Sequence, residues 1–388
     1  MMSEYDYELP DDRIAKVPLK DRASSKLLVA GQGGMETRTF RDLPSLLPKD
    51  SFLVLNESKV ILARVAVNKK TGGGAEIFCL DPLEPSRDPA VALATHDPVV
   101  WNCLVGGKKI VQGDVLMAGD VQFTILKKNG NEAEVRIQWA DRQKTFGEIL
   151  EAIGKIPLPP YLKRDPVAED QVRYQTVYAK QEGSVAAPTA GLHFTDQVFE
   201  DLRKHGHQVE KVCLHVGAGT FKPVSAEDVK DHTMHAERFE VSLQFLKSLH
   251  AHLKSGAPVV AVGTTSLRTL ESLVWLNERN FAPQWAWKDQ PKSDPVQAIG
   301  ALIKRLEVQN QSKLIAETQI LIAPGYDFRI ASCLVTNFHQ PRSTLLLLVS
   351  AFLGDQKGGW KRVYDYALSQ GYRFLSFGDS SLLFLGCG

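Results

Sequence analysis

The chain has 388 residues, of which 44% are hydrophobic and 23% are charged, and its formal net charge at pH 7 is +1. This composition is typical of a globular protein and excludes both a disordered chain and a protein that is basic overall. The length exceeds what one simple core requires, so we expect two domains.

The N-terminus and the cysteines indicate a cytoplasmic protein. Residues 1–13 are acidic, whereas a signal peptide begins with basic residues and continues with an apolar run. The five cysteines are widely spaced and include no Cys-x-x-Cys pair, so we expect reduced thiols and no metal site. The longest apolar run, residues 344–354, is too short to cross a bilayer and predicts a buried helix.

The pattern of apolar residues changes twice in the first half of the chain. Residues 51–65 predict a strand, a polar turn and a second strand. Residues 67–146 contain short apolar runs broken by glycine turns, with a hairpin signal at 128–131 and no intervening helix, and therefore predict a small antiparallel β-barrel. A proline-rich connector, residues 155–164, follows.

The second half alternates between strand and helix patterns. We expect helices at 196–206, 243–256, 264–276, 343–354 and 361–371, and strands at 208–217, 258–262, 320–326 and 333–338. This alternation predicts an α/β fold. We expect a large α/β domain, residues 1–66 and 147–388, with the β-barrel domain of residues 67–146 inserted. Residues 277–311 predict a long surface segment that contains one helix.

A run of small residues leads to one histidine in the segment Gly183–Thr195. Small side chains let a ligand approach the backbone, so we expect this segment to line a pocket. Thr189 and His193 are the candidate catalytic residues of the segment. The alternative is that His193 only hydrogen-bonds the ligand or its own loop.

Two later segments place glycines and hydroxyl groups after strands. His215–Phe221 carries two of the three glycines of a dinucleotide fingerprint, which is a weak signal and is also compatible with a plain turn. Ala261–Glu271 is a stronger signal, because a strand runs into a Gly-Thr-Thr-Ser turn that opens a helix, where backbone N–H groups favour an anion. An ordinary helix cap with a salt pair between Arg268 and Glu271 is the alternative.

Histidines also follow two further strand-like segments. Asp231–Glu237 contains His232 and His235 with carboxylates, but no clear further metal ligand, so we interpret it as polar lining of a site rather than a metal centre. Val335–Leu345 ends a strand with Asn337 and His339. Because ligands bind at the carboxyl ends of strands in open α/β sheets, these strand ends predict one shared pocket.

These motifs together resemble one known family, the S-adenosylmethionine:tRNA ribosyltransferase-isomerases. The matching stretches extend from end to end and include YDYELPDDRIA, LVLNESKVILAR, IPLPPYLKR, SVAAPTAGLHFT, HVGAGTFKPV, DHTMHAERFEV, AVGTTSLRTLES, TNFHQPRSTLLLLVSAFLG and YRFLSFGDSSLL. The resemblance implies a β-barrel set into a larger α/β domain. It also implies transfer of the ribosyl part of S-adenosylmethionine to 7-aminomethyl-7-deazaguanine at the tRNA wobble position, with isomerisation and release of adenine and methionine.

The resemblance gives the candidate residues their expected roles. S-adenosylmethionine is then a cosubstrate, and no prosthetic group is expected. Catalysis is expected from His193, Thr189, His235 and Glu237. The expected cosubstrate-binding residues are Gly217, Gly219, Thr220, Thr264, Thr265, Ser266, Arg268, Asn337 and His339.

His193 is the candidate general base, because a neutral imidazole suits removal of a ribose proton next to the sulfonium near pH 7. Lys163 and Arg164, beside the proline connector, are expected to contact tRNA phosphates, with solvated surface charge as the alternative. We expect a monomer.

Two other functions remain open from the sequence. An S-adenosylmethionine-dependent RNA methyltransferase would share the cosubstrate, but no early glycine-rich strand–turn–helix is present. A non-catalytic RNA-binding protein would explain the barrel and the basic connector but would leave the polar strand ends without a purpose.

Overall fold

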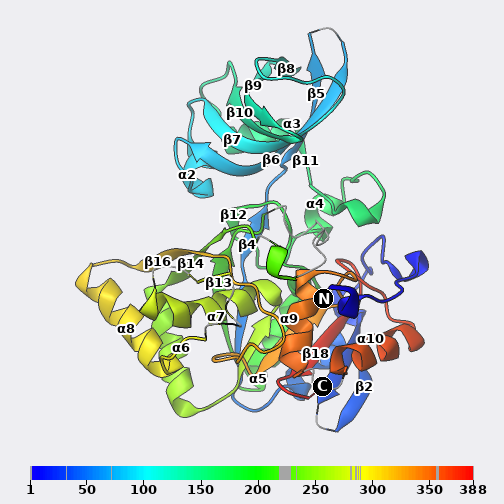
Figure 1. Ribbon diagram of the computed structural model, residues 1–388, viewed down its shortest axis with the longest axis vertical. Coiled ribbons are helices and arrows are strands. Elements are labelled where there is room, and N and C mark those ends of the chain that lie inside the picture. The colour runs from blue at the N-terminus through cyan, green and yellow to red at the C-terminus, as the bar shows by residue number, and fades with distance from the viewer. Residues whose placement is uncertain are drawn as a thin grey trace.

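The structure is a computed structural model that describes residues 2–31, 33–70, 72–217, 229–232, 234–279, 282–284, 286, 288, 290–354 and 358–387. The molecule has two parts: a large α/β part built on a nine-stranded mixed sheet, and a small β-barrel that stands at one end of it (Figure 1). Both chain termini lie in the large part, far from the barrel. The predicted fold class is confirmed.

The large sheet combines strands from both ends of the sequence. In spatial order its strands are β16 (Lys313–Thr318), β14 (Glu237–Ser242), β13 (Gln208–Leu214), β3 (Phe52–Asn56), β15 (Val259–Val262), β17 (Cys333–Asn337), β18 (Ser380–Phe384), β1 (Lys26–Gly31) and β2 (Gly34–Thr39). The central four, β13, β3, β15 and β17, are parallel. Their carboxyl ends therefore meet at one edge of the sheet.

Helices cover both faces of this sheet. Alternate residues of β3 point to opposite sides, so Phe52 and Val54 join one hydrophobic cluster and Leu53 and Leu55 another. One face packs against α6 (Leu243–Ser255), α7 (Thr264–Glu278), α8 (Pro295–Val308), α9 (Thr344–Leu353) and α10 (Gly359–Ser369). The other face packs against α1 (Leu43–Leu46) and α5 (Asp196–Lys204).

The barrel is a single antiparallel sheet closed on itself. Its strands are β5 (Arg64–Lys69), β6 (Gly74–Glu84), β7 (Val99–Gly106), β8 (Val115–Ala118), β9 (Val121–Asn129) and β10 (Glu132–Gln138), and pairing of β5 with β8 closes it. The predicted hairpin at 128–131 joins β9 to β10. The expectation of no helix in this region was wrong, because α2 (Pro89–Ala94) lies between β6 and β7, with Asp88 as its N-cap.

The barrel is joined to the large part at several points. Strand β11 (Gly154–Lys155) pairs with β5 after α3 (Phe146–Ile153), and the Arg238 guanidinium lies 2.6 Å from the Asp88 carboxylate across the boundary. Helix α4 (Asp170–Arg173) lies in the connecting region. We propose that the domains divide at residues 66/67 and 146/147, where the pattern of short apolar runs and glycine turns begins and ends in the sequence.

One predicted strand assignment differs from the structure. The two strands predicted within 51–65 are present as β3 and β4 (Ser58–Val60), and β4 pairs in parallel with β12 (Gln181–Ser184). The predicted strand at 320–326 was wrong, since residues 320–323 are buried without strand pairing and β16 instead forms at 313–318. A buried apolar run alone cannot distinguish these cases. Among the described helices, none is long and apolar enough to span a membrane.

Candidate active site between the barrel and the sheet edge

A cavity of about 760 Å³ lies between the barrel and the large domain. Residues of β6 and β7 line it on the barrel side, and the ends of β13, β15 and β17 line it on the sheet side. Its volume is in the range of small-molecule binding sites. Of the strand ends singled out in the sequence, Gly217, Thr264 and Asn337 reach this cavity and Thr189 lines it, whereas His193 does not.

The small residues of the segment 183–195 do make room for this cavity. Residues 186–190 line it directly. A Cβ on Gly183, whose φ is +136°, would lie 2.5 Å from Pro89 Cβ and 2.8 Å from His215 Nδ1. A Cβ on Gly191 would lie 2.0 Å from the Tyr178 hydroxyl oxygen. Larger side chains at these positions would collide with neighbours from the barrel segment and from the cavity wall.

His193 ends this segment in a 3-10 helix, Thr189–His193, and lies outside the large cavity. It lines a separate small cavity of about 20 Å³. Its Nδ1 lies 2.9 Å from the Ser25 hydroxyl, and its Nε2 lies 3.2 Å from Asn337 Nδ2. Because an amide nitrogen can only donate, Nε2 accepts and the proton is on Nδ1. Burial lowers the pKa of His193 to about 4, so the ring is neutral near pH 7.

Asn337, at the end of β17, does line the large cavity and is buried. Its Nδ2 also lies 3.4 Å from the carbonyl oxygens of Leu375 and Asp379. Leu375 has a φ of +68°, a conformation that is costly for a leucine. With the amide nitrogen held in this way, Oδ1 is buried and has no hydrogen-bond partner among the described residues.

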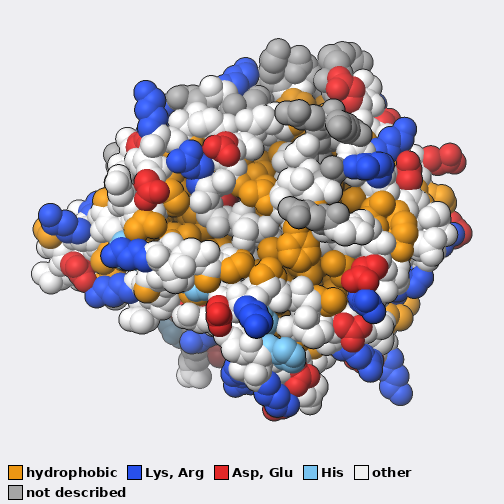
Figure 2. Space-filling model, turned by 90° about the horizontal axis from the view of Figure 1, so that it is seen from below, with side chains coloured by type: hydrophobic (Ala, Val, Ile, Leu, Met, Phe, Trp, Pro, Cys, Tyr) orange, Lys and Arg blue, Asp and Glu red, His pale blue; other side chains and the backbone are white. Residues whose placement is uncertain are grey.

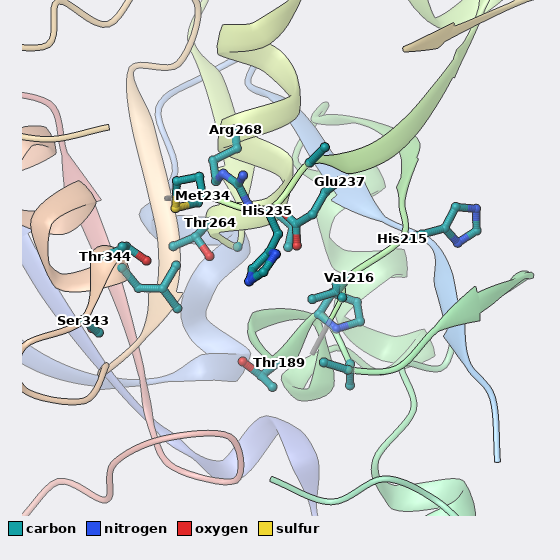
Figure 3. Close-up of a pocket in the computed structure, with 18 of the residues that line it drawn as sticks. Thr189, His215, Val216, Met234, His235, Glu237, Thr264, Arg268, Ser343 and Thr344 are labelled. Atoms are coloured by element: carbon teal, nitrogen blue, oxygen red, sulfur yellow. Dashed lines mark hydrogen bonds and ion pairs between the residues drawn. The ribbon is translucent and has the colours of Figure 1, made fainter. Parts of the chain in front are cut away.

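The start of α7 brings a charged pair to the cavity. Gly263, with a φ of +87°, precedes the helix, and Thr264 and Thr265 line the cavity. The buried Arg268 guanidinium contacts the Glu237 carboxylate through Nη1 and donates from Nε to the Ile320 carbonyl at 3.1 Å (Figure 3). Its Nη2 is buried and has no partner among the described residues.

The rest of the α7 segment differs from the alternatives considered above. Arg268 does not pair with Glu271. The buried Glu271 carboxylate instead accepts from the backbone N–H groups of Arg329, Ile330 and Ala331 and from the Tyr326 hydroxyl, and its burial raises its pKa. Ser266 is also buried and does not line the cavity. Arg268 and Glu271 are three residues apart on α7, a spacing at which the two side chains could pair. Each side chain instead bonds to residues from other segments of the chain.

The segment 231–237 contributes two further side chains. His235 lines the cavity and in Figure 3 its ring lies in the space between Thr264, Thr189 and Val216. Glu237, the first residue of β14, lines the cavity beside it. Within the described residues there is no group of three or more side chains suited to hold a metal ion.

Of the remaining predicted binding residues, two line the cavity and two lie outside the described residues. Gly217 lines the cavity, whereas Gly219 and Thr220 lie outside the described residues. His339 lines the cavity, and burial lowers its pKa to about 4, while its Nε2 lies 2.9 Å from the Thr336 hydroxyl. Close by, Ser343 and Thr344 at the start of α9 present a second helix N-terminus to the cavity (Figure 3).

The sequence reasoning missed the barrel side of the cavity. Asp81 and Asn102 lie at paired positions on β6 and β7 and both line the cavity. A signal was present, because a charged residue and a proline interrupt the alternating pattern of β6 at Asp81-Pro82.

The two basic residues of the connector have protein partners. Lys163 Nζ lies 2.8 Å from the Asp11 carboxylate and stays largely exposed. Arg164 makes two bonds of 2.6 and 2.7 Å to the carboxylate of Asp170 and donates to the Lys16 carbonyl. At the end of the molecule opposite the barrel, Lys and Arg side chains are interspersed with Asp and Glu among the described residues in view (Figure 2). That face does not have the single-sign charge expected of an RNA-binding surface.

Comparisons with known proteins place these observations in a family. The family model described as "Queuosine biosynthesis protein" matches residues 2–383. Curated relatives named S-adenosylmethionine:tRNA ribosyltransferase-isomerase include those of Desulfitobacterium hafniense, Thermotoga petrophila and Nitrosospira multiformis. Each is 38% identical to this chain; the first two alignments cover 98% of this chain and 99% of the relative, and the third covers 98% of each.

One similar solved structure is the crystal structure of S-adenosylmethionine tRNA ribosyltransferase from Thermotoga maritima. It has 28% sequence identity and a TM-score of 0.49, and the match covers 98% of this chain and 99% of that one.

Proposed function

The chain belongs to the queuosine biosynthesis protein family, and we propose that it is an S-adenosylmethionine:tRNA ribosyltransferase-isomerase. It acts on S-adenosylmethionine and tRNA, as the names of its full-length relatives state for those proteins. The observation that carries the proposal is the cavity of about 760 Å³ between barrel and sheet edge, which Arg268 and Asn337 line and which is in the size range of small-molecule sites.

The finer reaction follows from the family resemblance. The ribosyl group of S-adenosylmethionine is transferred to the aminomethyl group of a 7-deazaguanine base at the tRNA wobble position and is rearranged, giving epoxyqueuosine in tRNA. Adenine and methionine are released. The sulfonium supplies a positive charge next to the ribose carbon, so the reaction needs no Lewis acid to acidify that position.

The sheet side of the cavity suits S-adenosylmethionine. Arg268 can donate to the cosubstrate carboxylate or to a ribose hydroxyl from Nη2, while Glu237 and the Ile320 carbonyl hold the guanidinium in place. The N-terminus of α7 adds backbone N–H groups and the Thr264 and Thr265 hydroxyls.

We propose that His235, and not the His193 favoured by the sequence, carries out proton transfer. A general base must reach the proton that it removes, and His235 lines the cavity whereas His193 does not. We assign His235 as the base and Thr189 as a neighbouring hydroxyl of the site. His193 acts through Asn337, whose amide it holds at the cavity wall.

RNA binding at the connector stays a proposal for Lys163 and Arg164. Lys163 is exposed and can exchange Asp11 for a phosphate, whereas Arg164 would have to give up two bonds to Asp170. Lys163 is therefore the better candidate of the two for phosphate contact.

Incubation with labelled S-adenosylmethionine tests the function. We expect adenine and methionine to be released only when RNA carrying the aminomethyl-deazaguanine base is added. Release of S-adenosylhomocysteine with methylated RNA would instead assign a methyltransferase, and RNA binding without turnover would assign a binding protein.

A further inference from the structure

Strand β6 changes direction where it meets the cavity. Ile77 and Cys79 point into the barrel core and are buried, so the alternation of a strand would also direct residue 81 inward. The pairing with β7 shifts between Cys79 and Asp81, and again between Pro82 and Glu84. At the first shift two residues of β6 are accommodated for one of β7, which is a β-bulge.

This bulge turns a carboxylate out of the barrel. Asp81 is exposed and lines the cavity, while Pro82 takes the buried position beside Trp101. Bulges of this kind are frequent next to active sites because they re-aim one side chain. Without the bulge the carboxylate would point into an apolar core, where it would have no partner.

The neighbouring strand presents a carboxamide at the same place. Asn102 is the register partner of Asp81, is exposed, and lines the same cavity. Side chains directly opposite each other on antiparallel strands lie close enough to contact one ligand together. Neither side chain has a hydrogen-bond partner or ion pair within the described parts of the chain, so both are free for a ligand.

The charge around Asp81 favours a ligand that donates hydrogen bonds. Although the Asp81 side chain stays accessible in the cavity, the protein around it partly desolvates the carboxylate and raises its pKa; the negative charge of Glu237 raises it further, and His235 acts in the opposite direction. A ligand with two N–H donors would stabilise the ionised carboxylate and relieve this cost.

We infer that Asp81 and Asn102 recognise the base of the RNA substrate, and that the base they select has the Watson–Crick edge of guanine. That edge presents two adjacent donors, N1–H and the 2-amino group, beside the O6 acceptor. The carboxylate accepts from both donors, and the Asn102 amide donates to O6. Adenine, cytosine and uracil lack two adjacent donors on this edge, so the carboxylate would face an acceptor in each of them.

This inference rests on the proposed function for the nature of the RNA base, and it divides the cavity between its two walls. Arg268, Asn337 and the start of α7 bind the cosubstrate from the sheet side, and the barrel binds the base. Enzymes that modify a base take it out of the stack and read its edge in a pocket. A cavity walled by two domains admits the two substrates from different sides.

The test uses two RNA hairpins that differ in one group. One carries 7-aminomethyl-7-deazaguanine, and the other carries the same base with hydrogen in place of the 2-amino group. Affinity is measured by fluorescence anisotropy, and kcat/KM by adenine release. Wild-type protein should prefer the first hairpin about tenfold to a hundredfold, the range for a bidentate contact to a base.

Three variants separate recognition from folding. Asp81→Asn should bring the preference close to one while leaving calorimetric affinity for S-adenosylmethionine unchanged. Asn102→Ala should weaken both hairpins by the same factor, because O6 is present in both. Asp120→Asn makes the same change at an exposed barrel turn outside the cavity and should have no effect.

The outcomes distinguish this inference from the proposed function. If neither hairpin supports adenine release but Asp81→Asn still abolishes the binding preference, the proposed function fails and the base recognition stands. If wild-type protein releases adenine and Asp81→Asn retains the full preference for the 2-amino group, Asp81 does not recognise the base and the inference is overturned.

Discussion

Asn337 Nδ2 lies 3.2 Å from His193 Nε2, so the imidazole at the end of the small-residue segment holds a cavity side chain in place instead of lining the cavity itself. Both nitrogens of the His193 ring are engaged, by Asn337 and by Ser25. The arrangement gives the histidine a positioning role that a substitution series can separate from proton transfer.

Replacing the two histidines should change the pH–rate profile differently. His193→Ala leaves the buried Asn337 amide without one partner, so kcat/KM should fall about tenfold, with the acidic limb of the profile unchanged. His235→Ala removes the proposed base and should lower turnover roughly a hundred- to ten-thousand-fold and remove that limb. The measurement is adenine release between pH 5 and 9. Loss of the limb in the His193 variant alone would return the role of base to His193.

Arg268→Lys tests the cosubstrate contact. Lysine keeps the charge but cannot reach Glu237, the Ile320 carbonyl and a ligand from one planar group. Affinity for S-adenosylmethionine should fall by about tenfold or more, as calorimetry at a temperature below the thermal midpoint of the variant would measure. Unaltered affinity would remove Arg268 from the binding site.

Glu237→Ala should cost about 3–5 kcal/mol of unfolding free energy, because it leaves the Arg268 guanidinium buried without its counter-charge. Urea unfolding at pH 7 is the measurement. The double variant Glu237→Leu with Arg268→Met removes both charges and should recover most of the loss. A Glu237→Ala protein as stable as wild type would mean that water or a local shift compensates the arginine.

Stability should depend on pH through the buried histidines. Burial lowers the pKa of His193 to about 4, below the unfolded value of about 6.5. Between these values the unfolded state binds the extra proton, so the stabilisation is complete above about pH 6.5 and is lost as the pH falls toward 4. For one such group the loss between pH 7 and 5 is about 2 kcal/mol.

The comparison of wild type with His193→Gln isolates this effect. The raised pKa of the buried Glu271 acts in the opposite direction in both proteins, so the difference between their pH slopes is the informative quantity. Wild type should lose about 2 kcal/mol more than the variant from pH 7 to 5 in urea titrations. Parallel slopes would show that His193 titrates alike in the folded and unfolded states.

Gly191→Ala should destabilise the protein by about 1–3 kcal/mol, because the new methyl group would lie 2.0 Å from the Tyr178 hydroxyl oxygen. Gly74→Ala is the matched control, since its Cβ would have no atom within 4 Å and its φ is not positive. The control should stay within about 0.5 kcal/mol of wild type. Equal thermal midpoints for both variants would show that the Tyr178 ring moves aside freely.

Local patterns predicted much of the fold. The barrel, the alternating strands and helices, and the α9 helix follow from periodicity and glycine turns, which act over a few residues. The strand predicted at 320–326 failed because residues 320–323 have the apolar content of a buried strand but no strand partner, and pairing is a long-range property.

The site was predictable where strand order alone decided it. Gly217, Thr264 and Asn337 reach one cavity because they follow β13, β15 and β17, parallel strands of one sheet. The direction of a side chain was not predictable: His193 turns away from the cavity through contacts with Ser25 and Asn337, which are 168 and 144 residues distant in the chain. Asp81 depends on a bulge, which requires the partner strand to define it.

The strands of the barrel, β5 to β10, follow one another in the chain, and this order has an evolutionary consequence. The barrel wall of the cavity is encoded by a single continuous stretch of the gene, between β4 and α3. The wall that contains Arg268 and Asn337 is encoded after that stretch. Exchange of the barrel between relatives would replace the Asp81–Asn102 wall as one cassette and leave the Arg268–Asn337 wall unaltered. Selectivity for one substrate can therefore drift or be recombined without altering the binding of the other, provided that the Arg238–Asp88 contact is inherited with the cassette.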